Sequence, residues 1–183
     1  PIGVMLGLNG SQNPFSGTPT YRSIEHLPLD QRVKAMSQSD IRAKILSEDP
    51  VKQSTFPLIH RILFTQMFRL GSPANYTPSP EESISAMAQN LGVTPQEMAY
   101  DILLENQGRG FIYAPLVNYA NYTMDACAEM LDDPYSIMGL GDGGAHVGFI
   151  LDAGYPTWLI SYWNQIQKRY SVSYTHLTLP TIA

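Results

Sequence analysis

The chain has 183 residues, a net charge of −5 at pH 7 and a sequence pI of about 5.2. Its Lys and Arg residues are scattered, which argues against nucleic acid as a partner, because nucleic-acid-binding surfaces carry a basic patch or stripe. No apolar run approaches the ~18 residues that would cross a membrane, and a single Cys127 excludes a disulfide framework and a Cys-rich metal site.

The N-terminal part predicts a strand, a loop and two short helices. Residues 1–8 form a strand-like apolar run, and residues 9–19 are rich in Gly, Ser, Asn and Pro, which favour turns. Apolar residues at helical spacing predict helices over 29–36 and 40–46, the second with Ser39 as its N-cap.

The middle of the chain predicts helices separated by a Pro-rich connector. The apolar segment 57–68 predicts a helix, and residues 71–80 read as the connector. The apolar stripe in 81–91 predicts an amphipathic helix that ends at Gly92. Thr94-Pro-Gln-Glu97 is a capping box that opens a helix running to about Glu105.

The last part of the chain alternates between predicted strands and helices. Strands are expected at 110–115 and 136–140, with helices at 123–131 and 156–168. Such alternation implies parallel neighbouring strands joined by right-handed crossovers. The chain is therefore expected to be α/β, and the pattern alone leaves open a doubly wound sheet or a (β/α)8 barrel.

One short run carries the chemistry. The apolar segment 136–140 is followed at once by Gly141-Asp142-Gly143-Gly144-Ala145-His146. A strand that ends in an acid and glycines presents a carboxylate at the mouth of a sheet or barrel, where barrel enzymes place catalytic groups. Asp142 is thus the main catalytic candidate, although an aspartate after a strand can also be a simple turn residue.

Each of the remaining candidate residues either contacts the substrate or has a structural role. Gly143 and Gly144 allow a sharp turn and close backbone approach to a ligand, and His146 either contacts the substrate or caps the loop. The pair Asn118 and Tyr119 follows a predicted strand and is a candidate for substrate binding. Large aromatic residues bury much area, so Tyr119, Tyr122, Tyr155 and Trp158 also fit the wall or the core. Cys127 falls in a helical pattern and reads as a buried structural thiol.

The residues from Leu140 to Gly148, with Asp152-Ala-Gly-Tyr-Pro-Thr-Trp-Leu159, resemble the last barrel strand and following segment of amidohydrolases related to N-acyl-D-amino-acid deacylases. The strand that begins at Gly3, the Asn13-Pro-Phe-Ser loop and Pro115-Leu-Val-Asn-Tyr119 agree with that family in order. The resemblance spans residues 1–170.

This resemblance implies a partial TIM (β/α)8 barrel, consisting of its C-terminal strands and helices with inserted helices, in a metal-dependent hydrolase. It implies that Asp142 lies at a zinc centre, as metal ligand and as acid/base for a metal-activated water. The implied partner is a small-molecule N-acyl amino acid or related amide, bound by His146, Gly143, Gly144, Asn118 and Tyr119. Relatives usually have Ser where Gly141 stands, and losing that hydroxyl affects the tuning of the site.

The family's other metal ligands, including a His-x-His pair, are absent from this sequence. His26 and His60 have no ligand spacing with another His or an acid and read as surface and core residues. We therefore expect the remaining ligands to lie outside this chain, and the chain by itself to be inactive.

The expected boundaries follow from the two ends. Residues 1–171 are read as the C-terminal portion of the barrel, truncated at both ends, of a cytoplasmic protein. Residues 172–183 look like the translation of a sequencing-adapter DNA string rather than native protein. The alternative is a real strand followed by a Pro turn.

Two other functions compete with the amidohydrolase. A non-catalytic module could hold an anion or small ligand on the backbone N–H groups of Gly143 and Gly144, and metal content separates it from the enzyme. A doubly wound enzyme with Asp142 as triad acid would need a Gly-x-Ser-x-Gly elbow, which the chain lacks.

Overall fold

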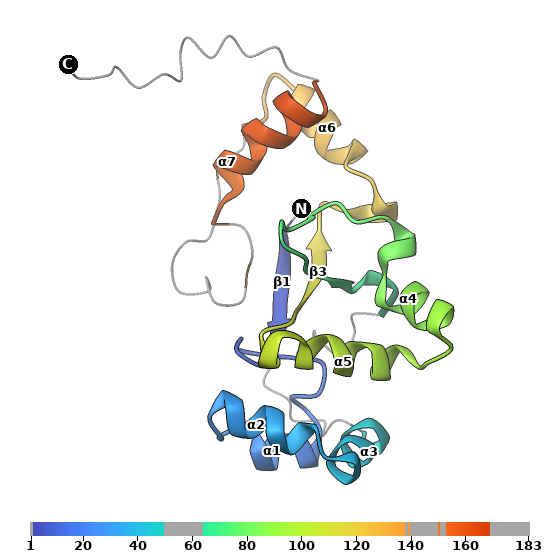
Figure 1. Ribbon diagram of the computed structural model, residues 1–183. Coiled ribbons are helices and arrows are strands. Elements are labelled where there is room, and N and C mark those ends of the chain that lie inside the picture. Colours follow the sequence, from blue (N-terminus) through green and yellow to red (C-terminus); the bar gives the residue numbers. More distant parts are fainter. Residues whose placement is uncertain (1, 50–63, 138, 140–149, 151–152, 169–183) are drawn as a thin grey trace, which may run out of the picture.

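The structure is a computed structural model that describes residues 2–49, 64–137, 139, 150 and 153–168. The described chain is mixed α/β, with a small sheet in the order β1–β3–β2 and helices around it (Figure 1). This confirms the α/β class at the coarse level.

The sheet is antiparallel throughout the described strands. β1 (Ile2–Gly7) pairs with β3 (Phe111–Val117), and β2 (Phe68–Arg69) pairs with the other edge of β3. Val4 lies opposite Ala114, and Leu6 lies opposite Ile112. Gly3 sits against the ring of Tyr113, where an added Cβ would come within 2.2 Å of a ring carbon, so only glycine fits at this contact.

The parallel pairing predicted for 110–115 and 136–140 is wrong for the described residues. Residues 136, 137 and 139 lie outside any strand, one edge of β3 pairs antiparallel with β1, and the other edge pairs antiparallel with β2 at Ile112 and Tyr113. The prediction assumed that β3 pairs with the next apolar segment along the chain. Its partner β1 instead lies about a hundred residues earlier, and local alternation carries no information on such long-range pairing.

Three short helices follow β1. These are α1 (Pro19–Ile24), α2 (Leu29–Met36) and α3 (Ser39–Ser47). The predictions for the second and third are confirmed. Residues 19–24 were not predicted as a helix, because six residues hold less than two turns of apolar periodicity.

The N-cap of α3 is Gln38 rather than Ser39. Gln38 is extended, with φ −78° and ψ 133°, whereas Ser39 is already the first helical residue. No side-chain hydrogen bond caps this end, so the hydroxyl of Ser39 did not decide where the helix begins.

The segment 64–69 is not the end of a helix. It contains a 3₁₀ turn, η2 (Phe64–Gln66), and then β2, while residues 50–63 lie outside the described part. Phe68 is buried opposite Tyr113, so pairing with the sheet overrides the helical pattern of the predicted helix 57–68.

The predictions for the next two helices are confirmed. A 3₁₀ turn, η3 (Pro80–Glu82), leads into α4 (Ile84–Leu91), which ends at Gly92 with φ 68°. α5 (Pro95–Gly108) begins at the predicted capping box of Thr94 and Glu97. Its last turn leaves helical geometry at residues 105–107.

The main core lies between the sheet and these helices. α5 packs against β3 and α2, and the hydroxyl of Tyr100 on α5 donates to the backbone oxygen of Met36, 2.8 Å away. Fully buried side chains from both layers meet here: Leu6, Met36, Ile84, Ile102, Leu103 and Ile112.

The C-terminal helices pack on a separate apolar cluster. η4 (Ala120–Tyr122) leads into α6 (Asp125–Asp132), which packs on this cluster with α7 (Tyr155–Leu159) and η5 (Ile160–Ile166). The helices predicted at 123–131 and 156–168 are confirmed, although the second changes to π-helical geometry from residue 160. Figure 1 shows α6 and α7 side by side, beyond the end of the sheet at which β3 terminates.

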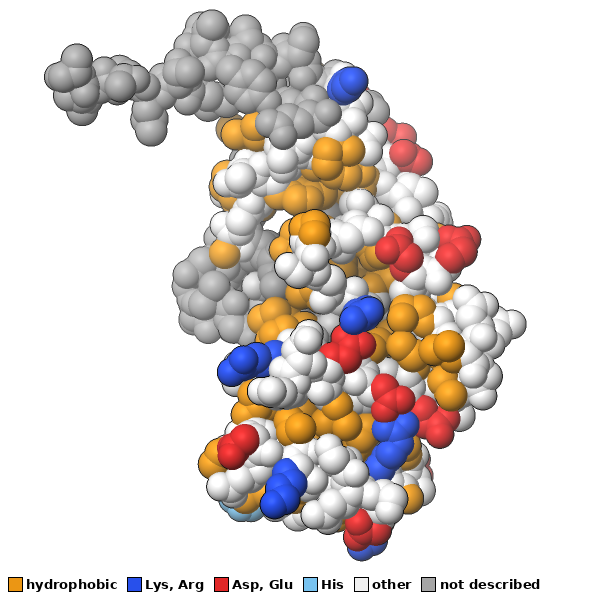
Figure 2. Space-filling model, viewed as in Figure 1, with side chains coloured by type: hydrophobic (Ala, Val, Ile, Leu, Met, Phe, Trp, Pro, Cys, Tyr) orange, Lys and Arg blue, Asp and Glu red, His pale blue; other side chains and the backbone are white. Residues whose placement is uncertain are grey.

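The surface of the described residues carries charges of both signs. Figure 2 shows Lys and Arg side chains interspersed with Asp and Glu over the described part of one face. Within the residues of known placement, none of the helices combines the length and apolar character needed to cross a bilayer.

Candidate functional site

The residues expected to carry the chemistry divide into two sets. Asn118 and Tyr119 are described by the structure. The others lie outside the described residues, at 140–149: Asp142, Gly143, Gly144 and His146. The site that can be built from geometry is therefore the one around Tyr119.

The backbone after β3 turns sharply before α6 begins. Asn118, Asn121 and Tyr122 have positive φ values of 62°, 55° and 58°. Asn adopts this left-handed conformation readily, whereas a tyrosine does so at a cost of about 1–3 kcal/mol. Strained positions of this kind persist where the surrounding contacts enforce them, and they are common at ligand sites.

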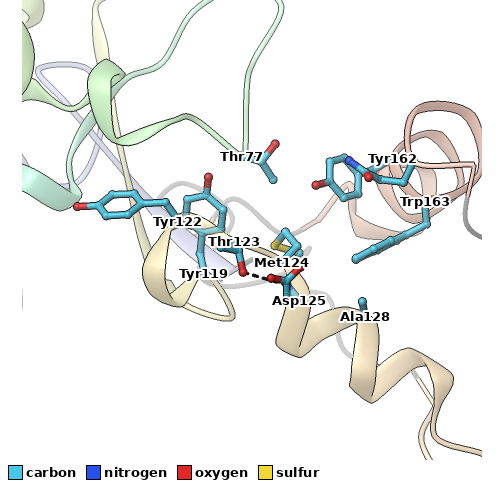
Figure 3. Close-up of a pocket in the computed structure, with 10 residues that line it drawn as sticks. Thr77, Tyr119, Tyr122, Thr123, Met124, Asp125, Ala128, Tyr162 and Trp163 are labelled. Carbon is cyan, nitrogen blue, oxygen red and sulfur yellow. Dashed lines mark hydrogen bonds between the residues drawn. The ribbon is translucent and has the colours of Figure 1, made fainter.

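Tyr119, Tyr122 and Thr123 of this turn form one side of a cavity of about 530 Å³ (Figure 3). The opposite side comes from η5, and Thr77 of the Pro-rich connector closes a third side. Figure 3 shows the side chains of Tyr162 and Trp163 reaching from η5 toward the start of α6. The lining residues are Thr77, Tyr119, Tyr122, Thr123, Met124, Asp125, Ala128, Tyr162, Trp163 and Gln167.

Two tyrosine hydroxyls tie this turn to earlier parts of the chain. The hydroxyl of Tyr119 donates to the backbone oxygen of Pro78 at 2.6 Å, and that of Tyr122 donates to the oxygen of Thr65 at 2.9 Å. Burial raises the pKa of Tyr119 to about 12, so this phenol stays protonated at neutral pH. Tyr119 therefore acts as a fixed hydrogen-bond donor that holds the connector, and its ring forms the cavity wall.

Aromatic contacts shape the rest of the wall. The rings of Tyr119 and Tyr122 meet edge to face at 6.4 Å, and those of Trp158 and Tyr162 stack at 4.4 Å. Trp163 is buried against Ala128 and its neighbours on α6. The expectation that Tyr119, Tyr122 and Trp158 serve as wall or core is confirmed.

Cys127 connects α6 to the same turn. Its thiol donates to the backbone oxygen of Asn118 at 3.3 Å, and burial raises the pKa of this thiol. A raised pKa means less thiolate at neutral pH, which is the opposite of what a nucleophile needs. The expected structural role of Cys127 is confirmed.

Polar groups in the cavity suit a small polar ligand. Thr77, Thr123 and Tyr162 supply hydroxyls, and Asp125 is the carboxylate among the lining residues. The hydroxyl oxygen of Thr123 accepts a hydrogen bond from the backbone N–H of Asp125 at 3.2 Å. This contact starts α6 and leaves the exposed Asp125 carboxylate available to a ligand.

The described residues do not assemble a metal centre. Within residues 2–49, 64–137, 139, 150 and 153–168, no three His, Cys, Asp or Glu side chains lie close enough to hold a metal ion. His26 is exposed, as expected of a surface histidine, and His60 lies outside the described residues.

Sequence reasoning identified one side of the cavity and missed the other. Asn118 and Tyr119 were selected because they follow a strand, but Tyr162 and Gln167 were treated only as part of a helix. The signal that could have found Tyr162 is its spacing from Trp158, because two aromatic residues four positions apart share one helix face.

No protein-family model, no curated protein and no solved structure matches the chain.

Proposed function

We propose that the chain is part of a metal-dependent amidohydrolase that cleaves the amide bond of an N-acyl amino acid or a related small amide. The observation that carries the proposal is the run Gly141-Asp142-Gly143-Gly144-Ala145-His146 after an apolar segment, with its resemblance to the deacylase family. The aromatic cavity next to Asn118 and Tyr119 supports it, because a barrel enzyme collects substrate-binding residues at strand ends.

The proposed zinc site draws on residues of the right chemical type. Zinc in catalytic sites is bound by His nitrogen and by Asp or Glu oxygen, and Asp142 is the candidate ligand in this chain. A bound zinc ion would supply a water whose pKa is lowered toward about 7. In this proposal, Asp142 would hold the metal and would serve as the acid/base group for cleavage of the amide bond.

The rest of the substrate site is assigned to described and undescribed residues together. Asn118, Tyr119, Gly143, Gly144 and His146 are proposed to contact the substrate. The hydroxyl of Tyr119 is committed to Pro78, so its contribution is the face of its ring. An apolar ring wall suits the acyl part of an N-acyl amino acid better than its carboxylate.

A partial (β/α)8 barrel is part of the same proposal. It requires parallel strands from outside the described residues, because residues 136, 137 and 139 lie outside any strand. β2 pairs only with Tyr113 and Ile112, so the edge of β3 from Ala114 onward is where a parallel neighbour would have to pair. The antiparallel β1 would then lie outside the parallel part of the barrel.

The first test is the DNA that adjoins this coding sequence. Amidohydrolases of this kind carry a His-x-His pair after an early strand, so we expect that motif upstream of Pro1. Its absence from the complete reading frame would remove the metal site and favour a non-catalytic module that binds an anion at Gly143 and Gly144.

The second test is the complete enzyme with Asp142→Asn. We expect turnover of an N-acetyl amino acid to fall by about 10²–10⁴-fold, because the acid/base group is lost. Asp49→Asn, at an exposed position, is the matched control and should keep full activity. Metal analysis of both proteins by mass spectrometry accompanies the assay. Near-normal turnover of the Asp142→Asn protein would refute the assigned role.

A further inference from the structure

A second cavity lies at the far side of the main core, away from the cavity around Tyr119. It has a volume of about 320 Å³ and is formed by the loop after β1 together with α1 and α2. Arg32 from α2 and Glu25, the residue that ends α1, bring opposite charges to its lining. Asn13, Ser11, Ser16 and Tyr21 add amide and hydroxyl groups.

Arg32 is held rigidly by uncharged oxygen atoms. Its Nη1 donates to the backbone oxygen of Leu8 at 2.8 Å and to the hydroxyl of Tyr21 at 3.3 Å, and its Nη2 donates to the oxygen of Leu27 at 2.9 Å. These bonds fix the plane of the guanidinium against the end of β1 and the end of α1. A guanidinium immobilised in this way loses little side-chain entropy when it binds a ligand.

The charge of Arg32 has no carboxylate partner among the described residues. The ion pairs there join Arg42 to Asp101 and Arg69 to Glu105, and neither involves Arg32. Its Nε is buried and has no hydrogen-bond partner in the described part of the chain. A half-buried guanidinium in this state retains unsatisfied electrostatic potential, because burial removes water without supplying a counter-charge.

Glu25 lines the same cavity but does not neutralise Arg32. Its carboxylate is exposed, and no ion pair joins it to Arg32. The cavity wall therefore carries one positive and one negative charge that do not pair with each other. A bare anion would meet repulsion from Glu25, and a bare cation would meet repulsion from Arg32, whereas a small molecule that carries both charges can satisfy each.

Internal hydrogen bonds hold the loop that completes the cavity. Asn13 is only 2% exposed, and its side-chain oxygen accepts a hydrogen bond from the backbone N–H of Phe15 at 2.9 Å. The hydroxyl of Ser16 accepts from the backbone N–H of Asn13 at 2.9 Å. These bonds preform the loop, which lowers the cost of binding a ligand there.

We propose that this cavity binds a small zwitterion of the α-amino acid class, with its carboxylate toward Arg32 and its ammonium group toward Glu25. Arg32 attracts the carboxylate by its charge and by the one Nη2 N–H that its bonds to Leu8, Tyr21 and Leu27 leave over. The hydroxyl and amide groups of the loop provide further hydrogen bonds. This site uses neither Asp142 nor a metal, so it stands or falls independently of the proposed amidohydrolase function.

The test is ligand-observed NMR on the full chain with alanine as the zwitterion, acetate as the anion and methylammonium as the cation. We expect saturable binding of alanine in the millimolar range and binding at least about tenfold weaker for either single-charge probe. Addition of EDTA should change nothing. Acetate that binds as tightly as alanine, or alanine that fails to bind, would overturn the proposal.

Two variants separate ligand recognition from folding. Glu25→Gln removes an exposed charge for which the described structure shows no hydrogen bond or ion pair, so the fold should persist, and alanine binding should weaken about fivefold while acetate binding strengthens. Glu129→Gln on α6 is the matched control and should leave both unchanged. Arg32→Lys keeps the charge without the planar group and should weaken alanine about tenfold. Unchanged alanine binding in the Glu25→Gln protein would contradict the proposal whatever the lysine variant does.

Discussion

The two apolar clusters of the molecule differ in how completely they are buried. The main core, between the sheet and α2, α4 and α5, contains many side chains with no exposed surface, among them Leu6, Met36 and Tyr100. The cluster between α6 and η5 is small, and its members Met124 and Cys127 keep 7% and 8% of their surface exposed. From this contrast we expect the first region to supply most of the stability, while the cavity around Tyr119 lies beside the second (Figures 1 and 3).

The physical reason is the number of layers that each cluster closes. The main core is covered by a sheet on one side and by helices on the other, so its side chains lose all contact with water. The second cluster is enclosed mainly by α6, α7 and η5, and a large cavity occupies part of the space between them. Regions with few buried contacts open more readily, and ligand-binding segments are drawn from them.

The largest effect that this comparison predicts is on the main core. Leu6→Ala should lower the free energy of unfolding by about 2–5 kcal/mol, because it leaves a cavity beneath β1. Urea denaturation followed by circular dichroism measures the loss. Leu91→Ala is the matched control, since Leu91 is 66% exposed, and it should change stability by less than about 0.5 kcal/mol. Equal losses in the two variants would contradict the assignment of Leu6 to the core.

A smaller global effect is expected from the second cluster. Trp163→Ala removes its largest buried side chain, so α6 and η5 should open locally while the sheet and α5 stay folded. Hydrogen exchange should show lost protection in residues 125–132, with the global unfolding free energy lowered by no more than about 1 kcal/mol.

The control for this experiment is Tyr135→Ala, because Tyr135 is also aromatic but is 97% exposed. It should leave exchange in α6 unchanged. If Trp163→Ala instead abolished protection in α5 to the same extent as in α6, the two clusters would be one cooperative unit, and the division drawn above would be wrong.

The same contrast separates what the sequence could predict from what it could not. Local signals worked well: the capping box at Thr94, the terminating Gly92 and the helical spacing in 29–36 all depend on residues a few positions apart. The pairing of β1 with β3 and of Phe68 with Tyr113 joins distant segments, and no local pattern encodes it. For this reason the expected pairing of 110–115 with 136–140 was wrong for the described residues, while most helices were right.

The candidate site shows the same limit. Tyr119 could be found because it follows a strand, but its cavity partners Tyr162 and Thr77 come from segments more than forty residues away on either side. The charged cavity near Arg32 was not predicted at all. Arg32 lies in an ordinary amphipathic helix pattern, and only the tertiary structure shows that its guanidinium turns inward to Leu8 and Tyr21.

The smallest predicted effect concerns the pH dependence of the more stable region. Hydrogen bonds from the backbone N–H and hydroxyl of Thr94 lower the pKa of Glu97 from its ordinary value of 4.5. A lowered pKa in the folded state means that the unfolded chain binds this proton more readily. The carboxylate therefore stabilises the folded state above pH 4.5, and this contribution disappears as the pH falls through the folded-state pKa.

Glu97→Gln isolates this contribution, because glutamine can still complete the capping box but does not titrate. The melting temperature of this variant should fall less steeply than that of the wild type between about pH 5 and pH 3. Glu129→Gln, on α6 of the less buried region, should retain the wild-type slope. Met124, the N-cap residue of α6, makes no side-chain cap, whereas Thr94 caps α5. If Glu129→Gln flattened the dependence of the melting temperature on pH more than Glu97→Gln did, acid would act first on the cavity region rather than on the capped helix.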